Sequence, residues 1–532
     1  MKKLKFYSMI FLSIGVFSAC TSDLDITPED DNTFTAEEFY AQPNAYRMAV
    51  AGVYGNLSMP GVNGATSSSL SGVDAGTSQY GRCLWYLQNL TTDEVIWSYE
   101  NDPGSRDLQR NTWNSSNPII LGMFSRAMVG VAICNEFLRQ TTDEKLSARG
   151  VTDAALLADI ADFRNETRVI RAMYYYNMLD LFGKAPLYDE NSPLNSQGPQ
   201  MDRPELFEHI KTELTAVLPS LKPARTNEYG RVDQAVAHMI LAKMYLNAEV
   251  YIGTPMYTDC VAELNQVIAG GYSLNTNYLN NFKADNHTSP EMIFTLESDG
   301  NATQNYGPTT VMVNGQVGSL EQNGAAIGVG SGGWGGALRL RKQFVQKFQS
   351  AEFATDQRNT IIENGRPIDI ASPTAQGQGF ILQKYSNIGS DGIAGPNTTF
   401  VNTDFPLFRL ADAYLMYAEC AVRGASGATT AQAVNYVNAL RERANGGSTV
   451  ANIDSGDLTL DFILNERSRE LHWEGHRRQD LIRFGKYTGG SYNWAWKGNS
   501  ANGIAIPAFM KVYPIPAASL AANGNLVQNE GY

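Results

Sequence analysis

Apolar residues recur at helical spacing over long stretches of the chain. Between Phe163 and Leu181, the apolar positions 163, 170, 174, 178 and 181 fall seven, four, four and three residues apart, which places them on one face of a helix. Gly183 then predicts the end of that helix. A similar apolar stripe covers residues 206–217. These patterns predict a mainly α-helical protein.

Two parts of the chain predict pairs of helices joined by short turns. Residues 235–248 precede a second helix from about Asp259 to Ala269, and residues 410–421 precede another at 433–444. Each pair is about the size of a tetratricopeptide unit, roughly 34 residues, although the full repeat consensus is absent. With residues 119–138 and the stripes described above, we expect about four tetratricopeptide-like helical hairpins that form a scaffold.

The composition changes between about Gly271 and Phe405, where Asn, Gly, Ser and Thr become frequent. Residues 324–336 read GAAIGVGSGGWGG. Long irregular segments in compact proteins commonly carry functional surface. Aromatic residues such as Tyr306 and Trp334 argue against a disordered insertion. We therefore expect a long, irregular, mixed insertion that carries the ligand-binding surface.

The N-terminus has the pattern of a secretory leader. Three lysines precede an apolar run from Phe6 to Phe17, which ends in Ser18-Ala19-Cys20. The run is too short for a stable transmembrane helix, and small residues before a cysteine suit lipoprotein processing. We expect a signal peptide at 1–19, lipidation of Cys20, an acidic tether at 20–32 and a globular body at 33–532. The alternative is an ordinary secreted protein with a cysteine near its cleavage site.

Net charge and hydropathy limit the classes of partner that the protein can have. Loss of residues 1–19 removes three lysines and no acid, so the net charge changes from −13 to −16. Such a surface repels nucleic acid, which we exclude as a partner. The best later candidate for a membrane span, residues 232–252, carries Asp233, Lys243 and Glu249. From these residues we expect no stretch after Cys20 that is apolar enough to cross a membrane.

The cysteines and histidines give little sign of a metal site. The four cysteines after Cys20 fit no zinc spacing. Cys134 and Cys420 lie in apolar helical patterns, where we expect them buried and unpaired, although sequence alone leaves a disulfide open. His472 and His476 lie four apart on an expected helix and could face one metal ion, but packing of two polar residues is the simpler interpretation. We expect no metal and no cofactor.

Two sequence motifs give weak evidence for an enzyme, one for a dinucleotide-binding site and one for a glycosidase. Gly328, Gly330 and Gly333 match G-x-G-x-x-G, but no strand precedes and no helix follows, so a dinucleotide site is rejected. Asp93 and Glu94 are adjacent acids that point to different sides, whereas glycoside hydrolysis needs two carboxyls flanking one bond. A pair of acids distant in sequence remains possible, so a surface glycosidase stays as an alternative.

Six ordered segments and the C-terminus resemble the SusD/RagB family of outer-membrane glycan-binding lipoproteins. They are LTTDEVIWSYENDPGSRDLQRNTW (90–113), ETRVIRAMYYYNMLDLFGKAPL (166–187), GRVDQAVAHMILAKMYLNAEVY (230–251), FRLADAYLMYAEC (408–420), NERSRELHWEGHRRQDLIRFG (465–485), YPIPAASL and the terminal QNEGY. The resemblance covers nearly the whole mature chain. In the 465–485 segment, alternating acids and arginines predict a charge network on packed helices, with Gly475 at a close crossing. The body then divides into an N-terminal part at about 33–220 and a second part at about 221–532.

The resemblance is strongest to the starch-binding members, and it implies a site made by the N-terminal segment and the insertion. The matching positions are Asp74, Arg82, Trp97, Asn101, Tyr306 and Trp334. Aromatic faces attract the C–H bonds of a sugar ring, and fixed polar groups bind its hydroxyls. Polar neighbours around Trp97 and glycines around Trp334 favour exposure of both rings. Asp102 could take the place of Asn101.

The resemblance therefore implies a cell-surface receptor, not an enzyme. It would capture starch or malto-oligosaccharides and deliver them to a TonB-dependent, SusC-like outer-membrane barrel. The lipid at Cys20 would hold the protein in the outer membrane, facing the cell exterior. The same receptor role for another glycan or for peptides is a further alternative.

Overall fold

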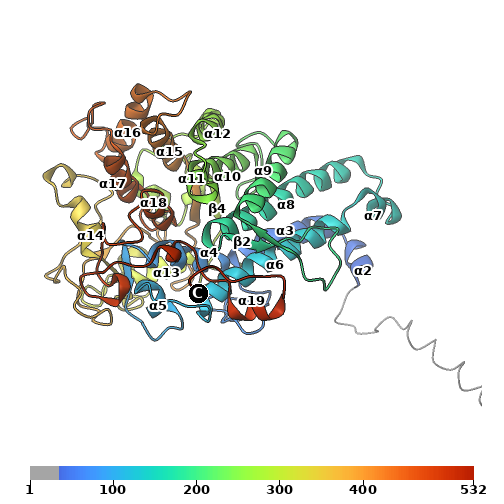
Figure 1. The fold of residues 1–532 in the computed structure, drawn as a ribbon, viewed down its shortest axis with the longest axis horizontal. Coiled ribbons are helices and arrows are strands. Elements are labelled where there is room, and N and C mark those ends of the chain that lie inside the picture. The colour runs from blue at the N-terminus through green and yellow to red at the C-terminus, as the bar shows by residue number, and fades with distance from the viewer. Residues whose placement is uncertain (1–34) are drawn as a thin grey trace, which may run out of the picture.

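The computed structural model describes residues 35–532. The signal peptide, Cys20 and the tether up to residue 32 lie outside the described residues and stay predictions. In Figure 1, α6, α8 and α9 lie at one end of the molecule and α15, α16 and α17 towards the other, with the insertion helices α13 and α14 along one flank.

Helices dominate the fold, as predicted. Before the insertion they are α2 (Ala36–Tyr40), α3 (Ala45–Ser58), α4 (Tyr80–Trp85), α5 (Ser105–Gln109), α6 (Pro118–Gln140), α7 (Asp143–Ala148), α8 (Ala154–Leu181), α9 (Arg203–Val217), α10 (Gln234–Leu246), α11 (Ala248–Ile252) and α12 (Tyr257–Ala269). The insertion and the C-terminal part add α13 (Pro308–Gly315), α14 (Lys342–Val345), α15 (Leu410–Val422), α16 (Thr430–Ala444), α17 (Leu460–Leu471), α18 (Arg477–Arg483) and α19 (Ala517–Ala522).

The predicted hairpins are present. The packed pairs are α6 with α8, α8 with α9, α10 with α12, and α15 with α16. Local signals set the helix ends: Asp153 accepts a hydrogen bond from the Leu156 N–H at 2.7 Å at the start of α8, and Gly183 follows its end with φ +68°. Since α12 also packs on α15, the array continues across the insertion, which leaves the scaffold after α12 and returns at α15.

One expectation about hydropathy was wrong. By length and composition alone, α6 is long and apolar enough to cross a membrane, although we expected no such segment after Cys20. In the structure α6 packs against α3, α4 and α8, and most of its apolar side chains are buried. Its apolar length is explained by its position inside the fold.

Short antiparallel strand pairs tie the insertion to the rest of the chain. The strands are β1 (Val95–Trp97), β2 (Lys184–Pro186), β3 (Gln200–Asp202), β4 (Met292–Leu296), β5 (Leu338–Leu340), β6 (Ile361–Ile362), β7 (Ile381–Leu382) and β8 (Phe405–Arg409). The pair β4–β8 closes the base of the insertion. The pair β1–β5 joins the N-terminal segment to the middle of the insertion. We call this second pair the β1–β5 ribbon.

The predicted charge network is confirmed, and it is buried. Arg409 donates to Glu470 at 2.8 Å, to Glu291 at 2.7 Å and to Glu474 at 2.6 Å. Glu470 also accepts from Arg443 and, at 3.2 Å, from Arg358. These contacts join the insertion, β8, α16 and α17, so the network links the scaffold to the insertion.

His472 and His476 are packed in the interior, as expected, but the expected helix through both is wrong; the expectation for the cysteines is confirmed. The helix α17 ends at Leu471, and His472 and His476 flank a turn in which Gly475 has φ +82°. His472 contacts the Arg469 carbonyl at 2.9 Å, whereas His476 contacts Lys243 at 3.1 Å. The two imidazoles therefore belong to different packing environments. Among the described residues, Cys134 and Cys420 are buried and free, as are Cys83 and Cys260.

The buried network predicts a large effect of Glu470→Gln. Burial alone would raise the pKa of Glu470, but Arg443, Arg409 and Arg358 hold that pKa well below its usual range. Loss of the charge leaves buried guanidiniums uncompensated, so the free energy of unfolding should fall by about 3–5 kcal/mol. Chemical denaturation measures this change.

Glu208→Gln is the matched control. Its carboxylate pairs with Lys211 at 2.7 Å on the surface, with 58% of the Glu208 side chain exposed. That variant should lose less than about 1 kcal/mol. Equal losses for the two variants would contradict a special role for the buried network.

Candidate functional site

The β1–β5 ribbon brings together two predicted site segments that are far apart in sequence. Trp97 pairs with Leu338, and Val95 pairs with Leu340. The ladder continues where the Ser98 N–H donates to the Ala337 carbonyl at 2.8 Å. Residues that precede β5 therefore lie beside residues that follow β1.

The glycine-rich loop before β5 presents Trp334. The Trp334 N–H donates to the Asn314 carbonyl at 3.0 Å, and the Gly336 N–H donates to the Val317 carbonyl at 2.7 Å. Gly333 has φ +44°, and a Cβ there would lie 2.5 Å from Val317 Cγ2. Only glycine combines this backbone conformation with such a close approach. The loop thus rests on the end of α13 and holds the tryptophan in place.

Five rings form a continuous aromatic cluster, which we define as Trp97, Tyr99, Tyr306, Trp334 and Phe400. The ring centroids of Trp97 and Trp334 are 6.2 Å apart at 89°, and those of Trp334 and Tyr306 are 6.4 Å apart at 43°. Phe400 lies 5.1 Å from Tyr306 at 59°. Tyr99 lies 5.7 Å from Trp97. The structure therefore brings together the three predicted aromatic residues.

Their exposures differ from the expectation at one position. Trp97 was expected to be exposed, but only 1% of it is accessible, because Tyr86, Tyr99 and Trp334 all pack against it. Trp334 and Tyr306 are half-buried. Trp97 therefore supports the cluster from below, while Trp334 and Tyr306 each keep part of their surface in solvent.

Tyr99 and Phe400 were missed by sequence reasoning. Tyr99 is 37% exposed, and its hydroxyl donates to the Trp334 carbonyl at 2.5 Å. It follows Trp97 by two residues, so strand alternation could have placed both on one side. For Phe400 we find no comparable local signal, because its contact with Tyr306 depends on the path of the insertion.

Arg82 is buried rather than presented to solvent. It is 5% exposed, and it donates to the Tyr86 hydroxyl at 2.6 Å and to the Tyr306 carbonyl at 3.3 Å. A further hydrogen bond reaches the Gly76 carbonyl. Arg82 thus ties the turn after the exposed Asp74 to the backbone of Tyr306.

The polar edge near Trp97 is made by Asn101 and Asp102. The Trp97 Nε1–H donates to Asp102 Oδ2 at 2.9 Å, so this carboxylate fixes the orientation of the indole. Asn101 is exposed, and its side chain makes no hydrogen bond to the described residues. The two neighbours therefore have separate positions, one holding the cluster and one facing solvent.

Asp93 and Glu94 are buried away from solvent. Asp93 accepts from Arg477 at 2.7 Å, from Lys347 at 2.8 Å and from the Tyr492 hydroxyl at 2.6 Å. Burial opposes the charge, but Arg477 and Lys347 hold the pKa of Asp93 well below its usual range. Burial raises the pKa of Glu94 to about 7. With 0% and 1% exposure, these two acids offer no access to a glycosidic bond.

The structure also bears on metal binding. Within residues 35–532, no group of three or more His, Cys, Asp or Glu side chains is placed to hold a metal ion. The segment Gly328–Gly333, which matches the dinucleotide motif in sequence, lies in turns that pack on neighbouring loops.

Comparison with known proteins agrees with this architecture. Residues 339–532 match the model of the SusD family. The starch-binding protein SusD of Bacteroides thetaiotaomicron is 31% identical over 98% of this chain and 97% of its own length. SusD-like protein P25 of Formosa agariphila is 24% identical over 99% of this chain and 100% of its own. The chain therefore belongs to the SusD family.

Solved structures share the fold. Surface glycan-binding protein A of Bacteroides thetaiotaomicron, in complex with laminarihexaose, has a TM-score of 0.67 at 24% identity and covers 91% of this chain and 98% of its own. A SusD homologue from the same species has a TM-score of 0.70 at 19% identity, with coverage of 94% and 100%.

The glycine loop yields a prediction about the site. In Gly333→Ala the new Cβ clashes with Val317, and the alanine must adopt a positive φ. The loop should therefore shift, and the free energy of unfolding should fall by about 1–3 kcal/mol. The Trp334 environment, followed by tryptophan fluorescence, should change with it. Gly332→Ala is the control, because nothing lies within 4 Å of a Cβ at that position. If both variants behave alike, the loop does not hold Trp334 as described.

Proposed function

We propose that this protein is a non-catalytic cell-surface receptor that binds starch or malto-oligosaccharides. The observation that carries the proposal is the aromatic cluster, in which Trp334 and Tyr306 are adjacent and partly exposed. The similarity to a relative named for starch binding supports the choice of glycan.

The cluster suits a curved sugar chain. Aromatic faces attract the slightly positive C–H bonds of a pyranose, and rigid rings lose little entropy on binding. The planes of Trp334 and Tyr306 are inclined by 43°, and those of Tyr306 and Phe400 by 59°. Inclined faces follow the curvature of an α-1,4-glucan better than that of a straight β-glucan. Asn101 and Asp74 are both exposed, so both are polar groups available for hydroxyls.

A laminarin-type glucan is a specific alternative ligand, because a protein with a similar fold was solved in complex with laminarihexaose. Calorimetric titration with maltohexaose and with laminarihexaose separates the two ligands. Preference for laminarihexaose would replace the starch assignment and retain the receptor role. Peptide binding without glycan binding would overturn both.

The receptor proposal also excludes turnover of the glycan. Asp93 and Glu94 are engaged in buried contacts and lack the access that hydrolysis requires. A reducing-end assay on starch incubated with the protein should therefore stay at background. Sustained release of reducing ends would favour the surface glycosidase instead.

We further propose that the protein is anchored in the outer membrane through lipidated Cys20 and faces the exterior. There it would pass captured oligosaccharides to a TonB-dependent, SusC-like barrel. Each aromatic stack adds only about 0.5–1.5 kcal/mol beyond its buried area, so we expect micromolar to millimolar dissociation constants. Tethering beside a transporter raises the effective concentration of weakly bound sugar.

Trp334→Ala should weaken binding of maltohexaose by about fivefold or more, because it removes a stacking face. The melting temperature should change little, because the ring is only half-buried. Tyr436→Ala is the control: it removes another half-buried ring, stacked on Tyr414 at 4.2 Å in the helical scaffold, and should leave affinity unchanged. Full affinity in Trp334→Ala would exclude the cluster as the site.

Trp97→Ala should lower both affinity and melting temperature, because that ring is buried.

Cys20→Ala tests the anchor. Without the thiol, no lipid can be attached, so the protein should leave the membrane fraction and lose its acyl label. Replacement of Cys83, a buried cysteine of the body, by alanine is the control and should keep the label. Retention of Cys20→Ala in the membrane fraction would contradict lipid anchoring.

A further inference from the structure

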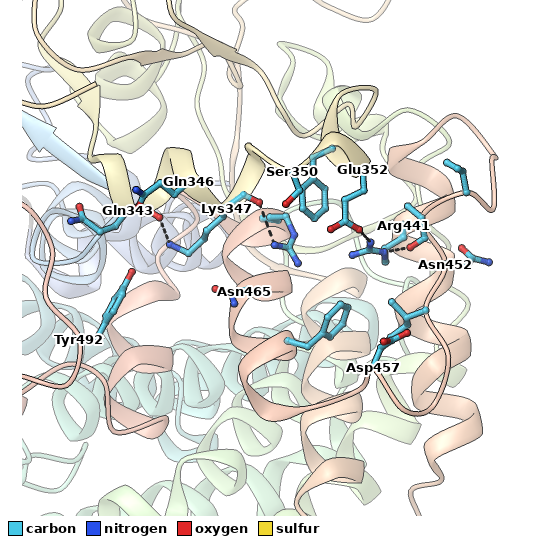
Figure 2. Close-up of a pocket in the computed structure, with 16 residues that line it drawn as sticks. Gln343, Gln346, Lys347, Ser350, Glu352, Arg441, Asn452, Asp457, Asn465 and Tyr492 are labelled. Atoms are coloured by element: carbon cyan, nitrogen blue, oxygen red, sulfur yellow. Dashed lines mark hydrogen bonds and ion pairs between the residues drawn. The ribbon is translucent and has the colours of Figure 1, made fainter. Parts of the chain in front are cut away.

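A cleft lies at the end of the β1–β5 ribbon that is away from the aromatic cluster. Its volume is about 610 Å³, within the range of small-molecule binding sites. The aromatic cluster adjoins the Trp97 end of the ribbon, whereas Asp93, just before Val95, contacts two residues that line this cleft, Lys347 and Tyr492. Figure 2 shows Gln343 and Gln346 along one wall, with Tyr492 at one end and Asp457 at the other.

The walls of the cleft are held in place by hydrogen bonds. The loop between α16 and α17 forms one wall, where the Asn438 amide donates to the Ile453 carbonyl at 3.0 Å and accepts from the Ile453 N–H at 2.8 Å. Arg441 donates to the Ala451 carbonyl. On the opposite wall, the Ala495 N–H donates to the Gln343 side chain at 3.2 Å. The cleft is therefore formed before any ligand arrives, which limits the entropy lost on binding.

The cations that line the cleft are already paired with carboxylates. Lys347 lies 2.8 Å from Asp93, Arg441 lies 2.8 Å from Glu352, and Arg469 donates to Glu466 at 2.7 Å. An anionic ligand would have to compete with these carboxylates for the same cations. The cleft therefore disfavours an anionic ligand.

Several polar groups in the cleft have no partner. The side chains of Gln346, Ser350 and Asn465 make no hydrogen bond to the described residues, although all three line the cleft. Each offers both donor and acceptor capacity, which matches a sugar hydroxyl. Phe462, which is half-buried, lines the same space and provides ring surface beside these polar groups.

We propose that this cleft is a second binding site, separate from the aromatic cluster, for a short neutral oligosaccharide. The ligand class rests on the proposed glycan-binding function, whereas the location rests on the cleft itself. A long glucan could then bind at both ends of the ribbon, and occupancy of two sites would slow its release.

The test is calorimetric titration of the full chain with maltotriose. Wild type should bind two molecules. Trp334→Ala should keep the cleft site and weaken the cluster site about fivefold or more, because it removes one stacking face. Asn465→Trp should keep only the cluster site, because its new indole fills the cleft, and the double variant should keep only the weakened cluster site. Replacement of both Gln346 and Asn465 by alanine should weaken the cleft site about tenfold by removing two polar contacts.

Asn435→Trp is the matched control. Asn435 is an exposed asparagine on α16, with no side-chain hydrogen bond to the described residues and no place in the cleft. This variant should keep two sites and the wild-type melting temperature, and Asn465→Trp should melt within a few degrees of it. If Asn465→Trp unfolds, the double alanine variant decides: a tenfold loss at one of two sites supports the cleft, and unchanged affinity at both overturns it.

The outcomes separate the two proposals. A single site in wild type, weakened in Trp334→Ala and unchanged in Asn465→Trp, overturns the cleft and leaves the proposed function intact. One site with the opposite dependence supports the cleft and removes the aromatic cluster. No binding of maltotriose or laminaritriose to wild type, or binding of peptide alone, overturns both.

Discussion

The arrangement of the β1–β5 ribbon depends on the contacts of one buried carboxylate, that of Asp93. It lies just before β1 and contacts Arg477 of α18, Lys347 after α14, and Tyr492 of the C-terminal part. With 0% exposure, it is stabilised only while these partners stay in place, because an unpaired buried charge is strongly unfavourable. One side chain therefore fixes one end of the β1–β5 ribbon relative to the C-terminal helices.

The arrangement of the proposed binding surface follows from that constraint. The ribbon brings Trp97 of the N-terminal segment against Trp334 of the insertion, and the glycine loop and α13 complete the arrangement. Because the surface combines two parts of the chain, neither part contains the site alone. The helical array provides rigid support, and the buried network around Glu470 and Arg409 connects this array to the insertion. We infer that this rigidity allows a few weak stacking contacts to select a curved glycan.

Local patterns predicted the helices well, and non-local contacts explain the errors. The end of α8 at Leu181 follows from its apolar spacing and from Gly183. The arginines and acids of residues 465–485 predicted the buried charge network. Burial of Trp97 was missed because its polar sequence neighbours indicate exposure, while the rings that cover it include Trp334 from a distant segment. The break between His472 and His476 was missed because Trp473, with φ +62°, adopts a conformation that sequence does not reveal for a bulky residue. Residue identities at the site came from family resemblance, and the structure added Tyr99 and Phe400.

The central claim is that a glucan chain binds across Trp334 and Tyr306. A crystal structure of the protein with bound maltohexaose tests it most directly. The account predicts consecutive glucose rings stacked on these two residues, with Trp97 beneath them and untouched by sugar. A sugar chain bound elsewhere, with Trp334 and Tyr306 bare, would contradict it.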